Sequence, residues 1–193
     1  ILHQSKFIYF STDFIFGENG PHQEEDITSP LNFYGESKLK AENWIKEFIP
    51  TAVIVRPVFI YGPELPGSRP SFIQWVQNQL LQQKPIKVVN DQKRTPTYVY
   101  DICQGLETII SGNHQGVFHL AGPDIITPYE MAIEVANCLS LNTHLIEAVD
   151  SNSFPEPVKR AKQSGLKIDK ARKVLNYKPH SFADGVRKSF FAF

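Results

Sequence analysis

Two apolar runs on either side of one amphipathic segment limit the folds open to this chain. Residues 6–10 are nearly continuously apolar, and residues 51–56 form a second run rich in β-branched side chains. Such runs are typical of strands buried on both faces of a parallel sheet. The segment from about Asn32 to Phe48 has helical apolar spacing and ends before Pro50. This strand–helix–strand order predicts an α/β chain with a doubly wound parallel sheet.

Polar side chains gather around the first predicted strand and the start of the helix. Ser11, Thr12 and Asp13 follow the strand directly, at the sheet edge where open α/β sheets bind ligands. Tyr34 and Lys38 lie four residues apart, so a helix places them on one face. A nearby lysine charge lowers the pKa of a phenol, which lets a tyrosine pass a proton near neutral pH. Tyr34 is therefore a candidate acid.

Composition excludes several classes of protein. The 193 residues are 41% hydrophobic and 21% charged, which is typical of a globular chain with one or two domains. No apolar run reaches the roughly 18 residues that span a bilayer, and no charged-then-apolar leader opens the chain, so we expect a cytoplasmic protein without a membrane partner. The two cysteines lack metal-type spacing, and we predict no metal site. A net charge of zero gives no support for a nucleic-acid partner.

An ordered series of motifs identifies a family resemblance. Residues 11–16 (STDFIF), 24–26 (EED) and 30–38 (PLNFYGESK) together resemble the extended short-chain dehydrogenase/reductases, and among them the dTDP-4-dehydrorhamnose reductase family. The resemblance implies the later strands of a doubly wound, Rossmann-like parallel sheet plus a small mixed α/β substrate domain. We expect residues 1–62 to form the second part of the dinucleotide-binding domain. Residues 63–193 would be mainly substrate-binding, with some segments returning to the Rossmann domain.

The resemblance also implies a reaction, namely reduction of the 4-keto group of a nucleotide-linked deoxysugar by NADPH or NADH, with NADPH favoured. Thr12 would hydrogen-bond the ketone oxygen while Tyr34 delivers the proton. Lys38 would lower the pKa of Tyr34 and hold the nicotinamide ribose. The implied cofactor-binding residues are Ser11, Tyr34, Lys38 and Pro57, and the implied substrate-binding residues are Thr12, Asp13, Phe59, Gln92 and Arg160.

Two departures from the family pattern leave alternatives open. Residues 56–59 read RPVF where the rhamnose-pathway reductases typically show R-T-S-W, so another sugar-nucleotide reductase or an epimerase is an alternative. A second alternative is a non-catalytic, NADP-binding regulatory subunit similar to the methionine adenosyltransferase beta subunit. The sequence also lacks a G-x-x-G-x-x-G turn, which in this family holds the cofactor diphosphate. We therefore expect the carboxyl-terminal part of a longer protein, without the amino-terminal cofactor half and inactive alone, and a homodimer is one option for the longer protein.

Further residues carry narrower expectations. Arg94 stands where the family has glycine, and we expect it to be exposed at a loop tip. His119 lies on a short apolar strand and is expected to be a packed histidine. The basic stretch from Lys159 to Lys178 either faces a diphosphate or forms a solvated surface. Further strands are predicted at 86–89, 116–120 and 143–147, a helix at 99–111, a capping box at 127–130 and a linker with Pro155 and Pro157.

Overall fold

A three-stranded parallel sheet forms the centre of the molecule. The structure is a computed structural model that describes residues 5–67, 69–154 and 158–191, so the predicted linker prolines lie outside the described residues. The sheet contains β1 (Ile8–Phe10), β2 (Val53–Arg56) and β6 (Gly116–His119) in the order β1-β2-β6. The strands predicted at 6–10, 51–56 and 116–120 are therefore confirmed, each slightly shorter than expected. The α/β class with parallel pairing is confirmed as well.

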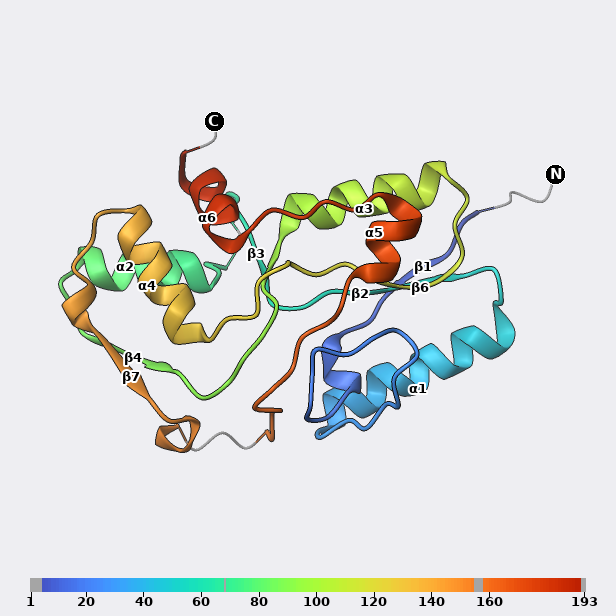
Figure 1. Cartoon of the computed structure of the whole chain (residues 1–193), viewed down its shortest axis with the longest axis horizontal. Coiled ribbons are helices and arrows are strands. Elements are labelled where there is room, and N and C mark those ends of the chain that lie inside the picture. Colours follow the sequence, from blue (N-terminus) through green and yellow to red (C-terminus); the bar gives the residue numbers. More distant parts are fainter. Residues whose placement is uncertain (1–4, 68, 155–157, 192–193) are drawn as a thin grey trace.

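Helices cover both faces of this sheet (Figure 1). They are α1 (Phe33–Phe48) on one face, and α3 (Val99–Ser111) and α5 (Asp169–Leu175) on the other. Successive side chains of a strand point to opposite faces, and β2 follows this rule. Val53 and Val55 belong to the core that includes Ile109 of α3, whereas Ile54 packs with Ile45 of α1. A strand rich in β-branched residues suits this two-sided burial.

A second group of elements packs around its own core. Strand β4 (Ile86–Val89) pairs in parallel with β7 (Ile146–Val149), and β3 (Ile60–Tyr61) pairs with β5 (Thr97–Tyr98). Helices α2 (Phe72–Leu81), α4 (Pro128–Cys138) and α6 (Phe182–Phe191) contribute side chains to the same core. Phe59 packs against both cores. The strand predicted at 143–147 was placed too early, because Thr143–Leu145 form a 3-10 turn that precedes β7.

Local signals set several helix boundaries. Asn32 caps α1, with its side-chain oxygen accepting from the amide of Gly35 at 2.9 Å. The capping box is confirmed, since Thr127 Oγ1 accepts from the amide of Glu130 at 3.1 Å and Glu130 Oε2 accepts from the amide of Thr127 at 2.7 Å. Asn176 ends α5 in the left-handed region at φ 50°. The helix predicted at 99–111 is confirmed.

The buried face of α1 differs from its apolar pattern. Leu39 and Ile45 pack against the cores, but Trp44 and Phe48 are 56% and 59% exposed and pack on each other instead. The position facing the sheet is taken by Glu42, which is fully buried and hydrogen-bonded to Arg56. No helix in the described ranges has both the length and the apolar character to cross a bilayer.

Candidate active site

The carboxyl end of β1 carries three buried polar residues, Ser11, Thr12 and Asp13. Thr12 caps the 3-10 turn Asp13–Ile15: its Oγ1 accepts from the amide of Phe14 at 3.3 Å and donates to Asp13 Oδ1 at 3.3 Å. The Ser11 hydroxyl is buried and has no hydrogen bond of good geometry within the described part of the chain, although it lies close enough to the Glu42 carboxyl to help lower the pKa of that group. A buried hydroxyl of this kind is a group that a bound ligand can satisfy.

Helix α1 brings Tyr34 and Lys38 to the same strand end. Lys38 Nζ donates to the carbonyl of Phe10 at 2.8 Å and lies 4.8 Å from the centroid of the Tyr9 ring. Tyr34 is 51% exposed, and its ring meets the Phe14 ring edge-on with centroids 5.7 Å apart. The predicted catalytic residues Thr12, Tyr34 and Lys38 therefore lie around one strand end. Their chemical roles stay predictions.

Arg94 contradicts the prediction of exposure at a loop tip. Its side chain is only 5% exposed, and it donates to Ser164 Oγ and to Gln92 Oε1, both at 2.6 Å. Burial raises the pKa of the nearby Asp13 carboxyl, while the Arg94 charge and a hydrogen bond from Ser164 act in the opposite direction. The guanidinium is buried because acceptors from separate segments surround it, which offsets the cost of removing the charge from water.

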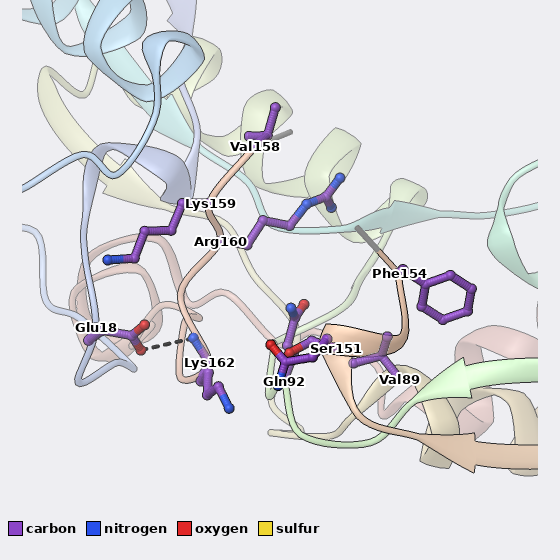
Figure 2. A pocket seen from close by; sticks show the side chains of 10 residues that line it. Glu18, Val89, Gln92, Ser151, Phe154, Val158, Lys159, Arg160 and Lys162 are labelled. Carbon is purple, nitrogen blue, oxygen red and sulfur yellow. Dashed lines mark hydrogen bonds between the residues drawn. The ribbon is translucent and has the colours of Figure 1, made fainter. Parts of the chain in front are cut away.

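A pocket of about 440 Å³ lies beside this cluster (Figure 2). It is formed by the end of β4 and the loop that follows, the segment 151–154 after β7, the segment 158–162 and the loop at Glu18. The lining residues are Glu18, Val89, Gln92, Ser151, Asn152, Phe154, Val158, Lys159, Arg160 and Lys162. Figure 2 shows the side chains of Lys159 and Arg160 leaving the chain in opposite directions. Lys162 Nζ pairs with Asp91 Oδ2 at 3.0 Å. The predicted substrate residues Gln92 and Arg160 both line this pocket.

A second cavity of about 300 Å³ adjoins the pocket and shares Val89, Gln92, Phe154 and Arg160 with it. Its other walls include the aromatic residues Phe59, Phe72 and Trp75, together with Lys87, Val88, Arg94 and Pro128. Phe59 thus lines a cavity, as expected of a substrate residue, with its backbone in the left-handed region at φ 38°. Pro57 is buried, and neither Pro57 nor Ser11 lines either cavity.

Arg160 connects the pocket with the residues at the end of β1. Its guanidinium carbon lies 5.9 Å from the centroid of the Phe14 ring, which in turn contacts Tyr34. A narrow crevice lined by Asp13, Phe14, Arg94 and Arg160 runs between the two groups. Sequence reasoning missed Phe154 and Ser151 as pocket residues, because neither belongs to a motif. For Arg94 the only signal was its departure from the expected glycine.

A buried charged network lies beneath the site. Arg56 donates to both carboxylate oxygens of Glu42, at 2.8 and 2.6 Å, and to the Glu24 carbonyl at 3.0 Å. Burial would raise the pKa of Glu42, but the hydrogen bonds and charge of Arg56 outweigh it and lower that pKa. His119, predicted to be a packed histidine, is fully buried here, which confirms the prediction. Glu24 is an acidic neighbour of His119, and Glu24 Oε1 accepts from the backbone amide of His119 at 3.0 Å.

Metal ligands are not grouped in this region. Within residues 5–67, 69–154 and 158–191, no three His, Cys, Asp or Glu side chains are arranged to hold a metal ion.

Comparison with known proteins places the chain among sugar-nucleotide enzymes and their relatives. The family model described as RmlD substrate binding domain matches residues 2–192. Methionine adenosyltransferase 2 subunit beta from Mus musculus is 31% identical over 193 residues, covering 96% of this chain and 57% of the relative. A dTDP-4-dehydrorhamnose reductase from Aggregatibacter actinomycetemcomitans is 29% identical over 192 residues, covering 93% and 64%.

Solved structures agree with this placement. The dTDP-4-dehydrorhamnose reductase of Bacillus anthracis str. Ames in complex with NADP superposes with a TM-score of 0.89 at 25% identity, over 98% of this chain and 66% of that one. A UDP-glucuronic acid 4-epimerase from Bacillus cereus in complex with NAD gives 0.75 at 25% identity, over 95% and 58%. The chain thus spans between about half and two-thirds of these relatives. With its parallel sheet and these matches, the chain belongs to the RmlD substrate-binding domain family, that of the dTDP-4-dehydrorhamnose reductases.

Proposed function

We propose that the complete protein reduces the 4-keto group of a nucleotide-linked deoxysugar with a hydride from NADPH or NADH. The observation that carries the proposal is the meeting of Thr12, Tyr34 and Lys38 at one strand end, beside a pocket lined by Gln92 and Arg160. Relatives of this chain are named as reductases of such a sugar, and one solved relative holds NADP.

The residues at the strand end fit the nicotinamide side of a dinucleotide. The half-buried Lys38 ammonium and the buried Ser11 hydroxyl offer donors for ribose hydroxyls. The bound cofactor supplies the hydride. As the hydride adds to the carbonyl carbon, the π electron pair moves to the ketone oxygen, which takes its proton from the Tyr34 hydroxyl. Thr12 turns its single hydroxyl proton from Asp13 Oδ1 to that oxygen and stabilises the charge that develops on it.

The residues of the pocket and the adjoining cavity favour a ligand that carries hydrogen-bond acceptors and flat apolar surfaces. Lys159 and Arg160 can only donate hydrogen bonds, which suits phosphate oxygens. The aromatic walls supplied by Phe59, Phe72 and Trp75 suit the faces of a base or a sugar ring. A nucleotide-linked sugar combines these two chemistries.

Tyr34→Phe tests the proposed reaction in the complete protein. Removing the proton donor while keeping the ring should lower turnover by roughly 10²- to 10⁴-fold, with little change in cofactor affinity. Turnover is followed as NAD(P)H oxidation, and a deuterium isotope effect on the hydride shows whether chemistry is rate-limiting. Tyr100→Phe, an exposed tyrosine of α3, is the matched control. Near-normal turnover of Tyr34→Phe with rate-limiting chemistry would show that another group is the acid.

A regulatory role is the second candidate, and the 31% identity to methionine adenosyltransferase 2 subunit beta favours it. Dinucleotide binding without turnover of any keto-sugar nucleotide would support this candidate.

An epimerase is the third candidate, favoured by the likeness to UDP-glucuronic acid 4-epimerase, and it would convert one sugar nucleotide into another without net oxidation of the cofactor. Comparing kcat/KM for NADPH and NADH tests the proposed preference for NADPH.

A further inference from the structure

Arg94 is held at both its backbone and its side chain. It lies in the segment between β4 and β5, where its amide donates to the Ile126 carbonyl at 2.9 Å and its carbonyl accepts from the Ile126 amide at 3.0 Å. Its Nη1 donates to Ser164 Oγ and its Nη2 to Gln92 Oε1, both at 2.6 Å. Bonds to two separate acceptors fix the plane of the guanidinium, and the guanidinium in turn fixes the groups that accept from it.

The contact with Arg94 determines which end of the Gln92 carboxamide faces the pocket. A guanidinium has only N–H donors, so the Gln92 atom that it meets must be the carbonyl oxygen. The amide nitrogen Nε2 is therefore the end that Arg94 does not hold, and Nε2 only donates. Gln92 lines both the 440 Å³ pocket and the adjoining aromatic cavity, so it offers these donors where the two cavities join.

We propose that Arg94 is a specificity-determining positioning residue that locks Gln92 as a hydrogen-bond donor. The pocket then selects a ligand that presents an oxygen acceptor at the junction of the two cavities. This inference rests on the proposed function, since it takes that acceptor to be an oxygen of the nucleotide-linked sugar. Arg94 also lines the aromatic cavity, and the experiments below separate a direct contact with the ligand from an effect that passes through Gln92.

The charge of Arg94 and its hydrogen-bonding geometry can be separated. The charge faces the buried Asp13 carboxyl, and its loss would leave that carboxyl without a compensating cation. Arg94→Lys keeps a positive charge at this position but cannot reproduce the planar pair of bonds to Ser164 and Gln92. Arg94→Lys is therefore the variant that tests the lock on Gln92 with the smallest cost to folding.

A double-mutant cycle in the complete protein tests the inference. The four proteins are the unmodified enzyme, Arg94→Lys, Gln92→Ala and the double variant; each is assayed for kcat and KM with a dTDP-linked 4-keto-6-deoxyhexose at saturating NADPH. Each single substitution should raise KM by roughly 3- to 10-fold, the value of one neutral hydrogen bond, with kcat nearly unchanged. In the Gln92→Ala background, Arg94→Lys should add less than about 2-fold, because its effect passes through Gln92. Fully additive effects, or a fall in kcat alone, overturn the proposal.

Gln92→Glu provides a second, independent arm. Glutamate can still accept from Arg94, but it turns a charged acceptor oxygen toward the acceptor of the ligand, so repulsion should raise its KM above that of Gln92→Ala. A Gln92→Glu protein with the KM of the unmodified enzyme would overturn the donor assignment. If Arg94→Lys fails to fold, as judged by its thermal unfolding midpoint, this arm decides alone.

The side-chain amide signal of Gln92 separates failure of this inference from failure of the proposed function. In ¹⁵N-labelled protein the signal is assigned by its absence in Gln92→Ala. Its ¹⁵N relaxation should indicate a rigid carboxamide in the unmodified protein and a more mobile one in Arg94→Lys. An unchanged signal overturns the lock even if the enzyme is active. Absence of turnover in the unmodified protein overturns the proposed reaction and the ligand class assigned here, whereas the amide signal still reports whether Arg94 orients Gln92.

Discussion

His119 is held neutral by the residues that surround its ring. Arg56 Nη1 lies 3.2 Å from Nε2, and a guanidinium can only donate, so Nε2 must accept. Nδ1 then carries the proton and donates to the carbonyl of Lys167 at 3.1 Å. Burial, followed by the charge of Arg56, lowers the pKa of His119 to about 3. The ring is therefore a neutral link between β6 and the segment that precedes α5.

This pKa leads to a prediction of acid sensitivity. The folded pKa of about 3 lies below the ordinary histidine pKa of 6.5, so the unfolded state binds more protons between these pH values. The free energy of unfolding should therefore be highest above pH 6.5 and fall as the pH decreases, by up to about 1.4 kcal/mol per pH unit for this one group. The lowered pKa of Glu42 adds to the loss at lower pH, and the raised pKa of Glu24 opposes it.

His119→Gln should flatten the dependence of stability on pH, because glutamine offers a donor and an acceptor without titrating. The measurement is urea unfolding of the complete protein at a series of pH values between 7 and 4. His144→Gln, at an exposed position, is the control and should keep the slope of the unmodified protein. A slope in His119→Gln equal to that of the control would show that another group causes the acid sensitivity.

At the scale of elements, the Glu42–Arg56 pair joins α1 to β2. Tyr34, Lys38 and Glu42 follow at intervals of four residues, so one helix face carries the candidate acid, its neighbouring ammonium and the anchor to the sheet. Both members of the pair are almost completely buried. The two-bond contact sets how α1 lies on the sheet, and thereby where Tyr34 and Lys38 meet the end of β1.

Glu42→Gln should lower the free energy of unfolding by about 3–5 kcal/mol, because it leaves the buried Arg56 charge without its counter-ion. Guanidinium unfolding at pH 7 measures the loss. The control is Lys46→Ala, which removes the partly exposed partner of Glu42 at 3.2 Å and should cost less than about 1 kcal/mol. A loss below 1 kcal/mol for Glu42→Gln would mean that the pair does not anchor the helix.

At the scale of the whole molecule, the pocket is assembled from segments far apart in the chain. The loop at Glu18, the segment 89–92, the segment 151–154 after β7 and the segment 158–162 all contribute walls. Hydrogen bonds tie them together: Glu18 Oε2 accepts from the amide of Lys162 at 2.8 Å, and Asp91 accepts from the amide of Ser151 at 2.9 Å. Together with a bond from Asn32 Nδ2 to the Lys159 carbonyl at 3.0 Å, these contacts hold the basic residues Lys159, Arg160 and Lys162 at the pocket.

Charge neutralisation tests what the basic segment binds. Lys159→Gln combined with Arg160→Gln should weaken binding of a sugar nucleotide and flatten its dependence on salt, because exposed charges act through screened attraction. Lys162→Gln is the comparison, since Lys162 already pairs with Asp91 and should change binding less. Titration calorimetry of the complete protein with dTDP at low and high ionic strength gives both quantities. Equal affinity of the double variant and the unmodified protein at every salt concentration would assign the segment to the solvated surface.

The spacing of apolar and polar residues within short segments determined several helices and strands of this protein. The strand at 86–89, the helix at 99–111 and the capping box at Thr127 depend on hydrogen bonds and side-chain directions within a few residues, so they follow from the sequence alone. The placement of Thr12, Tyr34 and Lys38 around the end of β1 was also predictable. The strand direction and the four-residue repeat of the helix placed residues within each segment, and the family resemblance of the ordered motifs brought the two segments together.

Tertiary structure alone decided which charged residues are buried and where the pocket lies. Arg94 was expected at the surface, yet its partner Ser164 is 70 residues away in the chain. On α1, Glu42 is buried against the sheet while Trp44 and Phe48 are exposed. Burial of the Glu42 carboxylate is tolerated because Arg56, 14 residues away, donates hydrogen bonds to it. The cost of burying a charge depends on the partners that meet it, and those partners come together only when distant segments pack. Gln92 and Arg160 share a pocket for the same reason.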